Sequence, residues 1–470
     1  MASAKMTVFV FCILSFTLSI DYSLSLISAL AYWNDLGGNH NYGGLLFGVY
    51  DAFVIIITPI LAKCVINKGQ NYKKMFVFCL IVNLIGNVMY GIAGFIQSWI
   101  VLLVGRIVSG IGATCVPLIM VFIFENIDGD EKNSVIAYIK YTATLSRMIG
   151  PIIGSVLSAS PDDNEETTIG RLFNMYTLVG WIPVLMCIIT IPIVLCCFND
   201  VKNPLIEDID TSEMYDIEGI VNKEDAIPEH INKVSCLDVF KQMWSILVLG
   251  FISTFVYWMF MSNSLIIATH YYTTIRNHYE LWHIYVSGFG GFIISFIVFM
   301  VAKKQMASLG GLMIGLILLY ASLIIFVVKN NIAYYVGTGM ITLSYGLSIP
   351  AINIINNQIA KQKNKSIGDN IALVITLLTI AQSIGRFVGP AMFSTFVTID
   401  DSSIDCDLSN DDKYIIEGCK LNNFTMATII IVCVSFIITL ICAKHIHTIL
   451  NHTSKSNETP LLQDKINNSA

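Results

Sequence analysis

Six ionisable side chains lie within long apolar stretches of the sequence, where charges are rare. They are Asp21, Asp51, Arg106, Lys140, Arg147 and Arg386. A charge at the centre of a bilayer costs about 2.5 to 3.5 kcal/mol on insertion scales, so such residues usually face a polar cavity or a partner. Because the cations outnumber the anions, an anionic solute such as an organic acid, phosphate or chloride would supply the missing partners.

Asp21 allows two interpretations. In the first, it is a carboxylate that responds to protons or substrate, because a neighbouring Arg106 or Arg147 favours its charged form while burial favours the neutral one. In the second, it forms a buried ion pair that only fixes helix packing. Lys140 and Arg147 are seven residues apart and share one helix face. Asp51 and Lys140 are weaker candidates, because either could reach toward a headgroup or loop.

The elements that carry these charges are predicted to be membrane-spanning helices. The chain is 55% hydrophobic and only 13% charged, against roughly a quarter charged in soluble proteins, which excludes a soluble multidomain enzyme. A span needs about 20 apolar residues, and the first stretch, with Asp21 at its middle, fits a retained span better than a signal peptide. Twelve stretches qualify, near residues 6–32, 43–65, 75–96, 99–124, 135–158, 173–198, 242–270, 282–302, 310–328, 332–356, 370–397 and 424–447.

The spans divide into two halves of six, which predicts an all-α membrane protein with two pseudo-symmetric bundles. Residues 1–198 and 242–447 form the bundles, 199–241 an acidic linker and 448–470 a tail. The linker is expected to be a flexible connector, with a partner-binding segment as the alternative. Arg147-x-x-Gly150-Pro151 recurs as Arg386-x-x-Gly389-Pro390 at the equivalent helix, which indicates an internal repeat. Both termini are predicted to be cytoplasmic, because that side holds most Lys and Arg of the short loops.

The motifs resemble those of the major facilitator superfamily over nearly the whole chain. Arg106-Ile-Val-Ser-Gly110-Ile-Gly112 is similar to the arginine motif of its fourth helix, and Gly150-Pro151-Ile-Ile-Gly154 to the Gly-Pro motif of its fifth. The loop after helix two keeps only Gly69 of the usual signature. The stretch 19–158 resembles the branch of the neuronal ceroid lipofuscinosis type seven protein and the vacuolar SPX carriers, although no SPX domain is present.

The resemblance implies a central cavity lined by helices one, four, seven and ten. Asp21 and Arg106 would then face the cavity, with Arg147 and Arg386 at pseudo-symmetric places beside it. Glycines and prolines of the motifs would serve helix packing or act as hinges. Tyr257, Trp258 and Tyr345 could line the cavity as aromatic walls or pack in the core.

Several features concern post-translational modification and subcellular location. Cys406 and Cys419 share one luminal loop and are expected to form a disulfide, and Asn423 begins a glycosylation sequon. The tail carries Glu458, Leu461 and Leu462 in an acidic dileucine-like order that a sorting adaptor could bind. With the branch resemblance, this favours the lysosomal or vacuolar membrane, with the plasma membrane as the alternative.

The sequence therefore predicts a carrier of a small, anionic solute that works by alternating access, with protons as a candidate coupling ion. A receptor or scaffold without transport, and a channel-like anion conductance, remain the alternatives. No nucleophile triad, phosphate loop or metal-ligand spacing is present, so we expect no enzyme activity, cofactor or metal. A net charge of −6 argues against a nucleic-acid partner.

Overall fold

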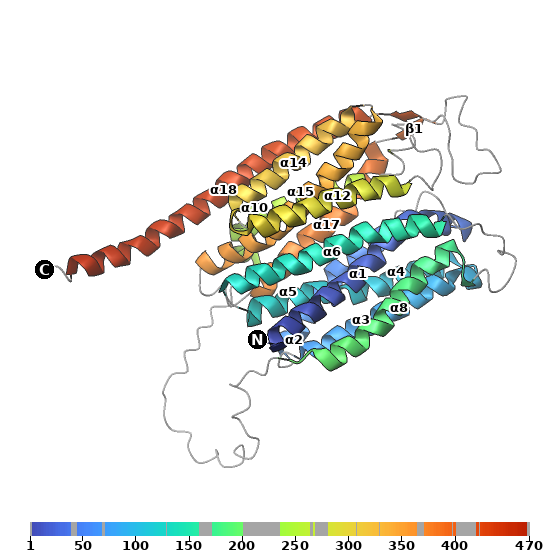
Figure 1. The fold of residues 1–470 in the computed structure, drawn as a ribbon, viewed down its shortest axis with the longest axis horizontal. Helices are drawn as coiled ribbons and strands as arrows, with labels where there is room; N and C mark the ends of the chain where they lie inside the picture. The colour runs from blue at the N-terminus through green and yellow to red at the C-terminus, as the bar shows by residue number, and fades with distance from the viewer. Residues whose placement is uncertain are drawn as a thin grey trace, which may run out of the picture.

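The computed structural model describes most of the chain, and structural statements below refer to that part. The described residues are 2–38, 45–67, 71–127, 129–158, 172–200, 236–263, 267, 281–306, 308–328, 330–363, 371–396, 398–400, 420–422 and 424–467. Nearly all of them are helical, and the helices form two bundles lying side by side (Figure 1). The predicted all-α membrane fold is confirmed.

The first half contains seven described helices for its six predicted spans. They are α1 (Ala2–Asp35), α2 (Leu45–Asn67), α3 (Tyr72–Ile96), α4 (Trp99–Ala113), α5 (Cys115–Asn126), α6 (Gly129–Ser158) and α8 (Met175–Cys197). The predicted fourth span is interrupted at Thr114 and consists of α4 and α5. Pro117 explains the interruption, because proline has no N–H to donate to the carbonyl of Ala113 and its ring crowds that carbonyl.

The second half repeats the pattern. Its helices are α10 (Cys236–Met261), α12 (Leu281–Val301), the short α13 (Lys303–Met306), α14 (Leu309–Val327), α15 (Asn331–Lys363), α17 (Ile371–Phe396) and α18 (Phe424–Asn467). Two short antiparallel strands, β1 (Thr398–Asp400) and β2 (Lys420–Asn422), lie between α17 and α18. The α10 helix begins inside the segment predicted as linker, and α18 continues into the predicted tail.

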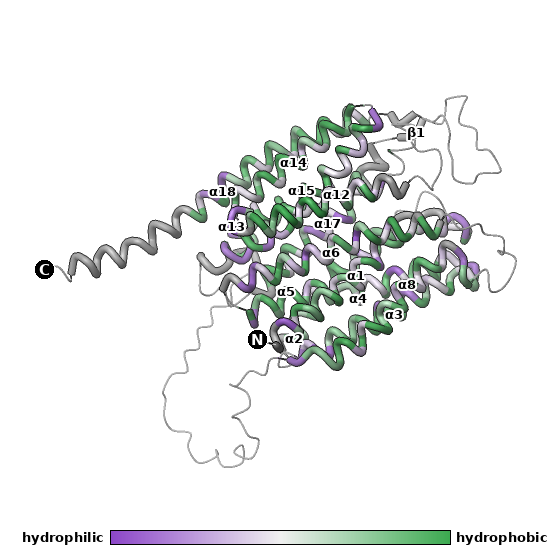
Figure 2. Tube along the Cα trace, viewed as in Figure 1, coloured by the Kyte–Doolittle hydropathy of each residue, from purple (hydrophilic) through white to green (hydrophobic). Residues whose placement is uncertain are grey.

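The helices of both bundles are mostly hydrophobic along their length (Figure 2). Many of their large apolar side chains are exposed, which fits a lipid environment. Ten helical segments in the described part of the chain are long and apolar enough to cross a membrane, with α4 and α5 forming one of them. The apolar segment of α12, Tyr285–Val301, is shorter. The α6 helix is not among the ten, and it is the helix that carries both Lys140 and Arg147.

The packing within each half shows the predicted duplication. In the first half, α1 packs against α6 and α8, α2 against α4, and α3 against α4 and α8. In the second half the equivalent helices pair the same way: α10 with α17 and α18, α12 with α15, and α14 with α15 and α18. The halves meet mainly where α2 packs against α17 and α6 packs against α12. The α6 and α12 helices lie side by side in Figure 1.

The glycine of the repeated Arg-x-x-Gly-Pro motif has the same role in helix packing in both halves. A side chain at Gly150 of α6 would collide with Ser23 of α1, and one at Gly389 of α17 would collide with the backbone of Phe255 in α10. Each glycine therefore allows the fifth helix of its half to approach the first closely, which is how small residues act in bilayers. Packing is thus the role that the structure shows for this part of the motif.

A neighbouring pair of glycines in α12 offers a test of close packing. A Cβ at Gly291 would overlap the backbone of Gly339 in α15, whereas a Cβ at Gly290 would meet nothing within 4 Å. We expect Gly291→Ala to lower the free energy of unfolding by about 1 to 3 kcal/mol, as overpacking does. Gly290→Ala should be neutral or slightly stabilising, because alanine favours helix. Thermal unfolding in detergent measures both, and equal effects would contradict the proposed contact.

Candidate functional site

A polar cavity of about 70 Å³ lies between the two halves. This volume accommodates about five water molecules at roughly 15 Å³ each, or a small solute. The cavity is lined by Leu18, Ser19, Tyr22, Tyr50, Val54, Ala113, Val116, Pro117, Met120, Ile139, Lys140, Ala143, Thr144, Arg147, Tyr345, Ile349, Thr379, Gln382 and Arg386. Residues from α1, α2, α4, α5, α6, α15 and α17 therefore contribute to one site.

Arg386 joins the two halves through an ion pair. Its Nε lies 2.7 Å from Oδ1 of Asp51, which belongs to α2 of the other half. Its Nη2 donates to Oγ of Ser383 at 2.6 Å, one turn earlier in α17. Asp51 is fully buried, and its second oxygen, Oδ2, has no hydrogen-bond partner. The alternative position of Asp51, in which it reaches toward a headgroup or loop, does not fit the structure, because its carboxylate is buried between the halves.

Arg147 also contacts the other half, but without a carboxylate. Its Nη1 donates to Oη of Tyr345 at 3.2 Å, and its guanidinium carbon lies 5.9 Å from the ring centroid of Trp258. Lys140 lies two turns earlier in α6 and reaches the same cavity. Among the described residues, neither Arg147 nor Lys140 has an ion-pair partner. The cavity wall therefore carries three cations, of which one is neutralised.

Asp21 and Arg106 form the second ion pair, and they lie behind the cavity wall. Arg106 Nη1 is 3.2 Å from Asp21 Oδ1, and both side chains are only 1% exposed. Neither residue lines the cavity, so the expectation that both face it is wrong. The reason is rotation about α1: the next residue, Tyr22, is turned by about 100° around the helix and takes the place on the wall.

A hydrogen-bond network holds Asp21 in place. Asn83 Nδ2 donates to Asp21 Oδ2 at 2.8 Å, and Asn87 Nδ2 donates to Asn83 Oδ1 at 3.2 Å. The guanidinium of Arg106 lies 4.6 Å from the ring centroid of Tyr50, which does line the cavity. Asp21 is therefore separated from the cavity by one arginine and one tyrosine ring.

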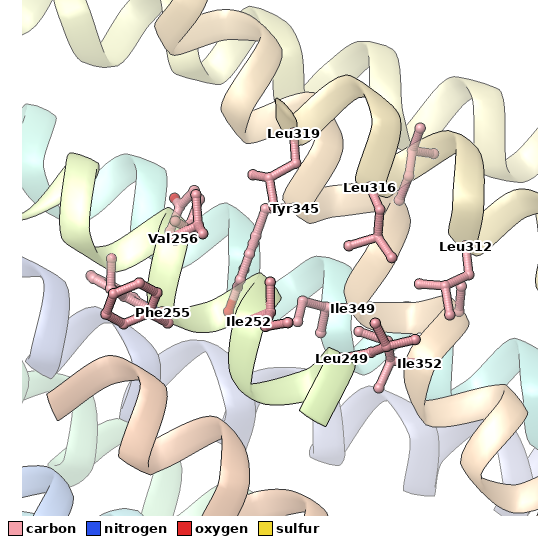
Figure 3. Close-up of a cluster of buried hydrophobic side chains, with 14 of the residues drawn as sticks. Leu249, Ile252, Phe255, Val256, Leu312, Leu316, Leu319, Tyr345, Ile349 and Ile352 are labelled. Atoms are coloured by element: carbon pink, nitrogen blue, oxygen red, sulfur yellow. The ribbon is translucent and has the colours of Figure 1, made fainter. Parts of the chain in front are cut away.

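Aromatic rings connect the halves near this network. The ring of Tyr22 meets the ring of Trp258 edge-on at 5.0 Å, and Tyr257 stacks on Tyr345 at 3.9 Å between centroids. Tyr345 lines the cavity and at the same time borders the buried apolar cluster of α10, α14 and α15 (Figure 3). Tyr257 and Trp258 are buried and do not line it. Of the three aromatic residues predicted for the wall, Tyr345 thus lines the cavity, together with Tyr22 and Tyr50, and the other two do not.

Two polar side chains of the cavity were not singled out from the sequence. The hydroxyl of Tyr22 and the Nε2 amide of Gln382 are buried, and neither has a hydrogen-bond partner. A buried polar group without a partner costs about 1 to 3 kcal/mol, so both groups are available to a bound solute. Gln382 is one helical turn from Arg386, and this spacing is the signal that could have identified it.

Contacts between the halves lie on both sides of the cavity along the bundle. On one side are Asp51 with Arg386 and Tyr22 with Trp258. On the other side, toward the start of α1, α5 packs against α17, and Ile375 of α17 belongs to a buried cluster otherwise made by the first half. The cavity lies between these two sets of contacts.

The remaining predicted residues have simpler positions. A side chain at Gly110 would meet the backbone of Tyr50, and one at Gly112 would meet Asn83. Pro151 lies inside α6 with Gly154, and Pro390 inside α17. Cys406, Cys419 and Asn423 lie outside the described residues. Glu458, Leu461 and Leu462 belong to the last part of α18, which is described by its backbone.

Two six-helix bundles that enclose a charged central cavity define a helical membrane transporter. The model of the Major Facilitator Superfamily matches residues 9–390. The chain therefore belongs to the major facilitator superfamily, as its motifs predicted.

The comparisons with individual proteins support this membership. The uncharacterized MFS-type transporter C330.07c of Schizosaccharomyces pombe is 24% identical over 174 residues, which are 36% of this chain and 34% of that relative. This chain thus matches only about a third of the relative's length. A bacterial homologue of the human lysosomal transporter Spinster, in an inward-facing and unoccupied conformation, has a TM-score of 0.58 at 14% identity, covering 96% of this chain and 98% of that one. The human organic anion transporter MFSD10 (TETRAN) has a TM-score of 0.61 at 10% identity, covering 94% and 99%. At these identities the solved structures show the fold alone.

Proposed function

We propose that this protein carries a small anion across the membrane by alternating access, and that the central cavity is the binding site. The observation that carries the proposal is the charge of the wall. Lys140, Arg147 and Arg386 line the cavity, and only Arg386 has a carboxylate partner in the described structure. Unpaired charges away from bulk water are unfavourable, so an anion that enters the cavity gains from both remaining cations.

The contacts between the halves provide the conformational part of the proposal. Opening the cavity on one side requires separation of Asp51 from Arg386 and of Tyr22 from Trp258. Opening on the other side requires separation of α5 from α17. Because each set can be broken while the other stays formed, the two halves can rock about the bound solute, as alternating access demands.

Proton coupling is proposed through Asp21. Its only described cation is Arg106, which in turn lies against the cavity residue Tyr50. Neutralising Asp21 would release Arg106 from its ion pair, and the change would reach the cavity wall through the tyrosine ring. Arg106 Nε and Nη2 have no hydrogen-bond partner, so the arginine has donors available for a second arrangement.

Thermal unfolding of the purified protein with a panel of small anions, cations and neutral metabolites tests the anion proposal. A ligand that binds only the native state raises its stability, by about 2.7 kcal/mol at a hundredfold excess over Kd. We expect stabilisation by one class of anion, and loss of that effect in Arg147→Gln. The control variant Lys74→Gln also replaces a cation with glutamine, but on an exposed part of α3. It should leave the stabilisation by the anion unchanged.

The same panel separates the alternatives. Stabilisation by neutral or cationic solutes alone would contradict the anion preference. No stabilisation, together with no flux, would favour a receptor or scaffold. Flux that saturates with solute concentration identifies a carrier, whereas unitary currents in a planar bilayer would identify an anion channel.

We further propose that both termini are cytoplasmic and that the protein resides in the lysosomal or vacuolar membrane. The positive charge of the short loops supports the orientation of the termini, and the dileucine-like tail supports the compartment. Replacing Leu461 and Leu462 with alanine should move the protein toward the plasma membrane, because the adaptor would lose its apolar anchor. Fluorescence imaging of tagged full-length protein measures the shift, and an unchanged location would remove the sorting role.

A further inference from the structure

We propose that the ligand of the cavity is a small dicarboxylate held at both ends. Lys140 binds one carboxylate, and Arg147 together with the Arg386 side of the cavity binds the other. The inference rests on the proposed anion transport and makes it more specific: it states the charge of the solute, its length and which residue meets each end.

The charge follows from the groups that face the cavity. Its wall carries Lys140, Arg147 and Arg386, and no carboxylate is among the residues that line it. Asp51, directly behind Arg386, neutralises one of the three cations. Asp21 and Arg106 neutralise each other and lie outside the cavity. Two positive charges remain, and a solute with two negative charges balances them, whereas a monoanion leaves one cation unpaired in a buried site.

The separation of Lys140 and Arg147 along α6 gives the expected length of the solute. Lys140 and Arg147 are seven residues apart in the continuous helix α6, which is about 10.5 Å at 1.5 Å per residue. Side chains on a helix lean in the same direction, so the charged ends keep about this spacing. Two charge-assisted hydrogen bonds of about 2.8 Å each leave about 5 Å between the outer oxygens of the solute. A dicarboxylate with a four-carbon chain, such as succinate, spans this gap.

The middle of the cavity suits a short methylene chain. Between the two cations α6 presents Ala143 and Thr144, whose hydroxyl is already used because it donates to the carbonyl of Lys140 at 2.9 Å. The rest of the wall includes apolar residues, among them Val116, Met120 and Ile139. An apolar centre between two charged ends matches the distribution of charge in a dicarboxylate, and the small volume excludes long-chain amphiphiles.

The cavity wall has further donors for a carboxylate. Gln382 Nε2 and Tyr22 Oη line the cavity without a partner, and Tyr345 Oη already holds Arg147 in position. The Lys140 end has only the ammonium group among the described charged residues. The two ends therefore differ: removing Lys140 should abolish recognition of the second carboxylate while leaving the first bound.

Equilibrium binding to the purified full-length protein, by calorimetry, tests the proposal. The probes are succinate and its monoanionic counterpart butyrate, together with malonate, glutarate, adipate and inorganic phosphate, at constant ionic strength. We expect succinate to bind about ten- to a hundredfold more tightly than butyrate, because one charged hydrogen bond distinguishes them. Affinity should peak at succinate or glutarate and fall for the shorter and longer acids.

Variants assign the second carboxylate to its residue. In Lys140→Gln, succinate and butyrate should bind equally, whereas Lys140→Arg should keep the preference for succinate. Lys444→Gln, a matched change of an exposed lysine in α18, should have no effect. The comparison of succinate with butyrate on the unaltered protein needs no variant, so it holds even if Lys140→Gln fails to fold.

The outcomes separate this inference from the proposed function. Equal binding of butyrate and succinate would overturn the dicarboxylate and leave an anion carrier. Tight binding of phosphate without succinate would overturn the two-ended arrangement, because both charges of phosphate sit at one point. An unchanged preference for succinate in Lys140→Gln would overturn the role of that lysine. No binding of any of these anions would overturn the inference, and the wider panel of anions described above would then decide whether the proposed anion transport survives.

Discussion

Replacing Arg386 with glutamine should lower the free energy of unfolding by about 3 to 5 kcal/mol, the cost of removing one partner from a buried ion pair. Asp51 is 0% exposed and has Arg386 as the partner of its Oδ1, while its Oδ2 has none. The variant would therefore leave a carboxylate enclosed between the two halves without a cation. Denaturant or thermal unfolding in detergent micelles measures the loss.

Further variants separate the contribution of the ion pair to the free energy of unfolding from that of the neighbouring hydrogen bond. Ser383→Ala removes only the hydroxyl that accepts from Arg386 Nη2 and should cost about 1 kcal/mol. The double variant Asp51→Asn, Arg386→Gln removes both charges and should be more stable than Arg386→Gln alone, because no charge is left unpaired. If Arg386→Gln costs no more than Ser383→Ala, the ion pair does not hold the halves together.

Replacing Asp21 with asparagine should remove the response of transport to a proton gradient. Asparagine keeps the shape of the side chain but has one acceptor oxygen in place of two, so it keeps a hydrogen bond from either Arg106 or Asn83, which lie 3.2 Å and 2.8 Å from the two carboxylate oxygens. It cannot gain or lose a proton. Uptake into proteoliposomes, measured with and without a pH difference across the membrane, should therefore become independent of that difference. The loss of gradient-driven uptake should be about a hundredfold, the lower end of general acid–base contributions.

The matched control for Asp21→Asn removes a different carboxylate of the same half, one that does not line the cavity. Glu125 in α5 accepts a hydrogen bond from Tyr72 of α3, and Glu125→Gln should leave the response to the gradient unchanged. Uptake by Asp21→Asn with an unchanged rate and an unchanged response to pH would reduce Asp21 and Arg106 to a structural pair. The anion proposal would survive that result, because Asp21 does not line the cavity.

The charged residues show where sequence reasoning succeeded and where it stopped. All six intramembrane charges were found, because a charge is conspicuous in an apolar stretch. The ion-pair partners of these residues could not be predicted from the sequence. Asp21 had two candidate partners, Arg106 and Arg147, and Asp51 had none assigned. The structure pairs Asp51 with Arg386 across the halves, 335 residues apart in sequence. Such a contact depends on how two bundles dock, and no local spacing encodes it.

The sequence by itself determined the helical spans, the duplication and the charges within them. Lipid offers the backbone no hydrogen-bond partners, so an apolar stretch of sufficient length must form a helix on local grounds, and the repeated Arg-x-x-Gly-Pro motif is visible in the residues themselves. The tertiary structure alone decided which side chains face the cavity. Rotation of α1 by one residue puts Tyr22 on the wall and Asp21 behind it, and the docking of α17 brings Gln382 to the same cavity. Helix rotation and docking arise from contacts between distant segments, which spacing along one helix does not specify.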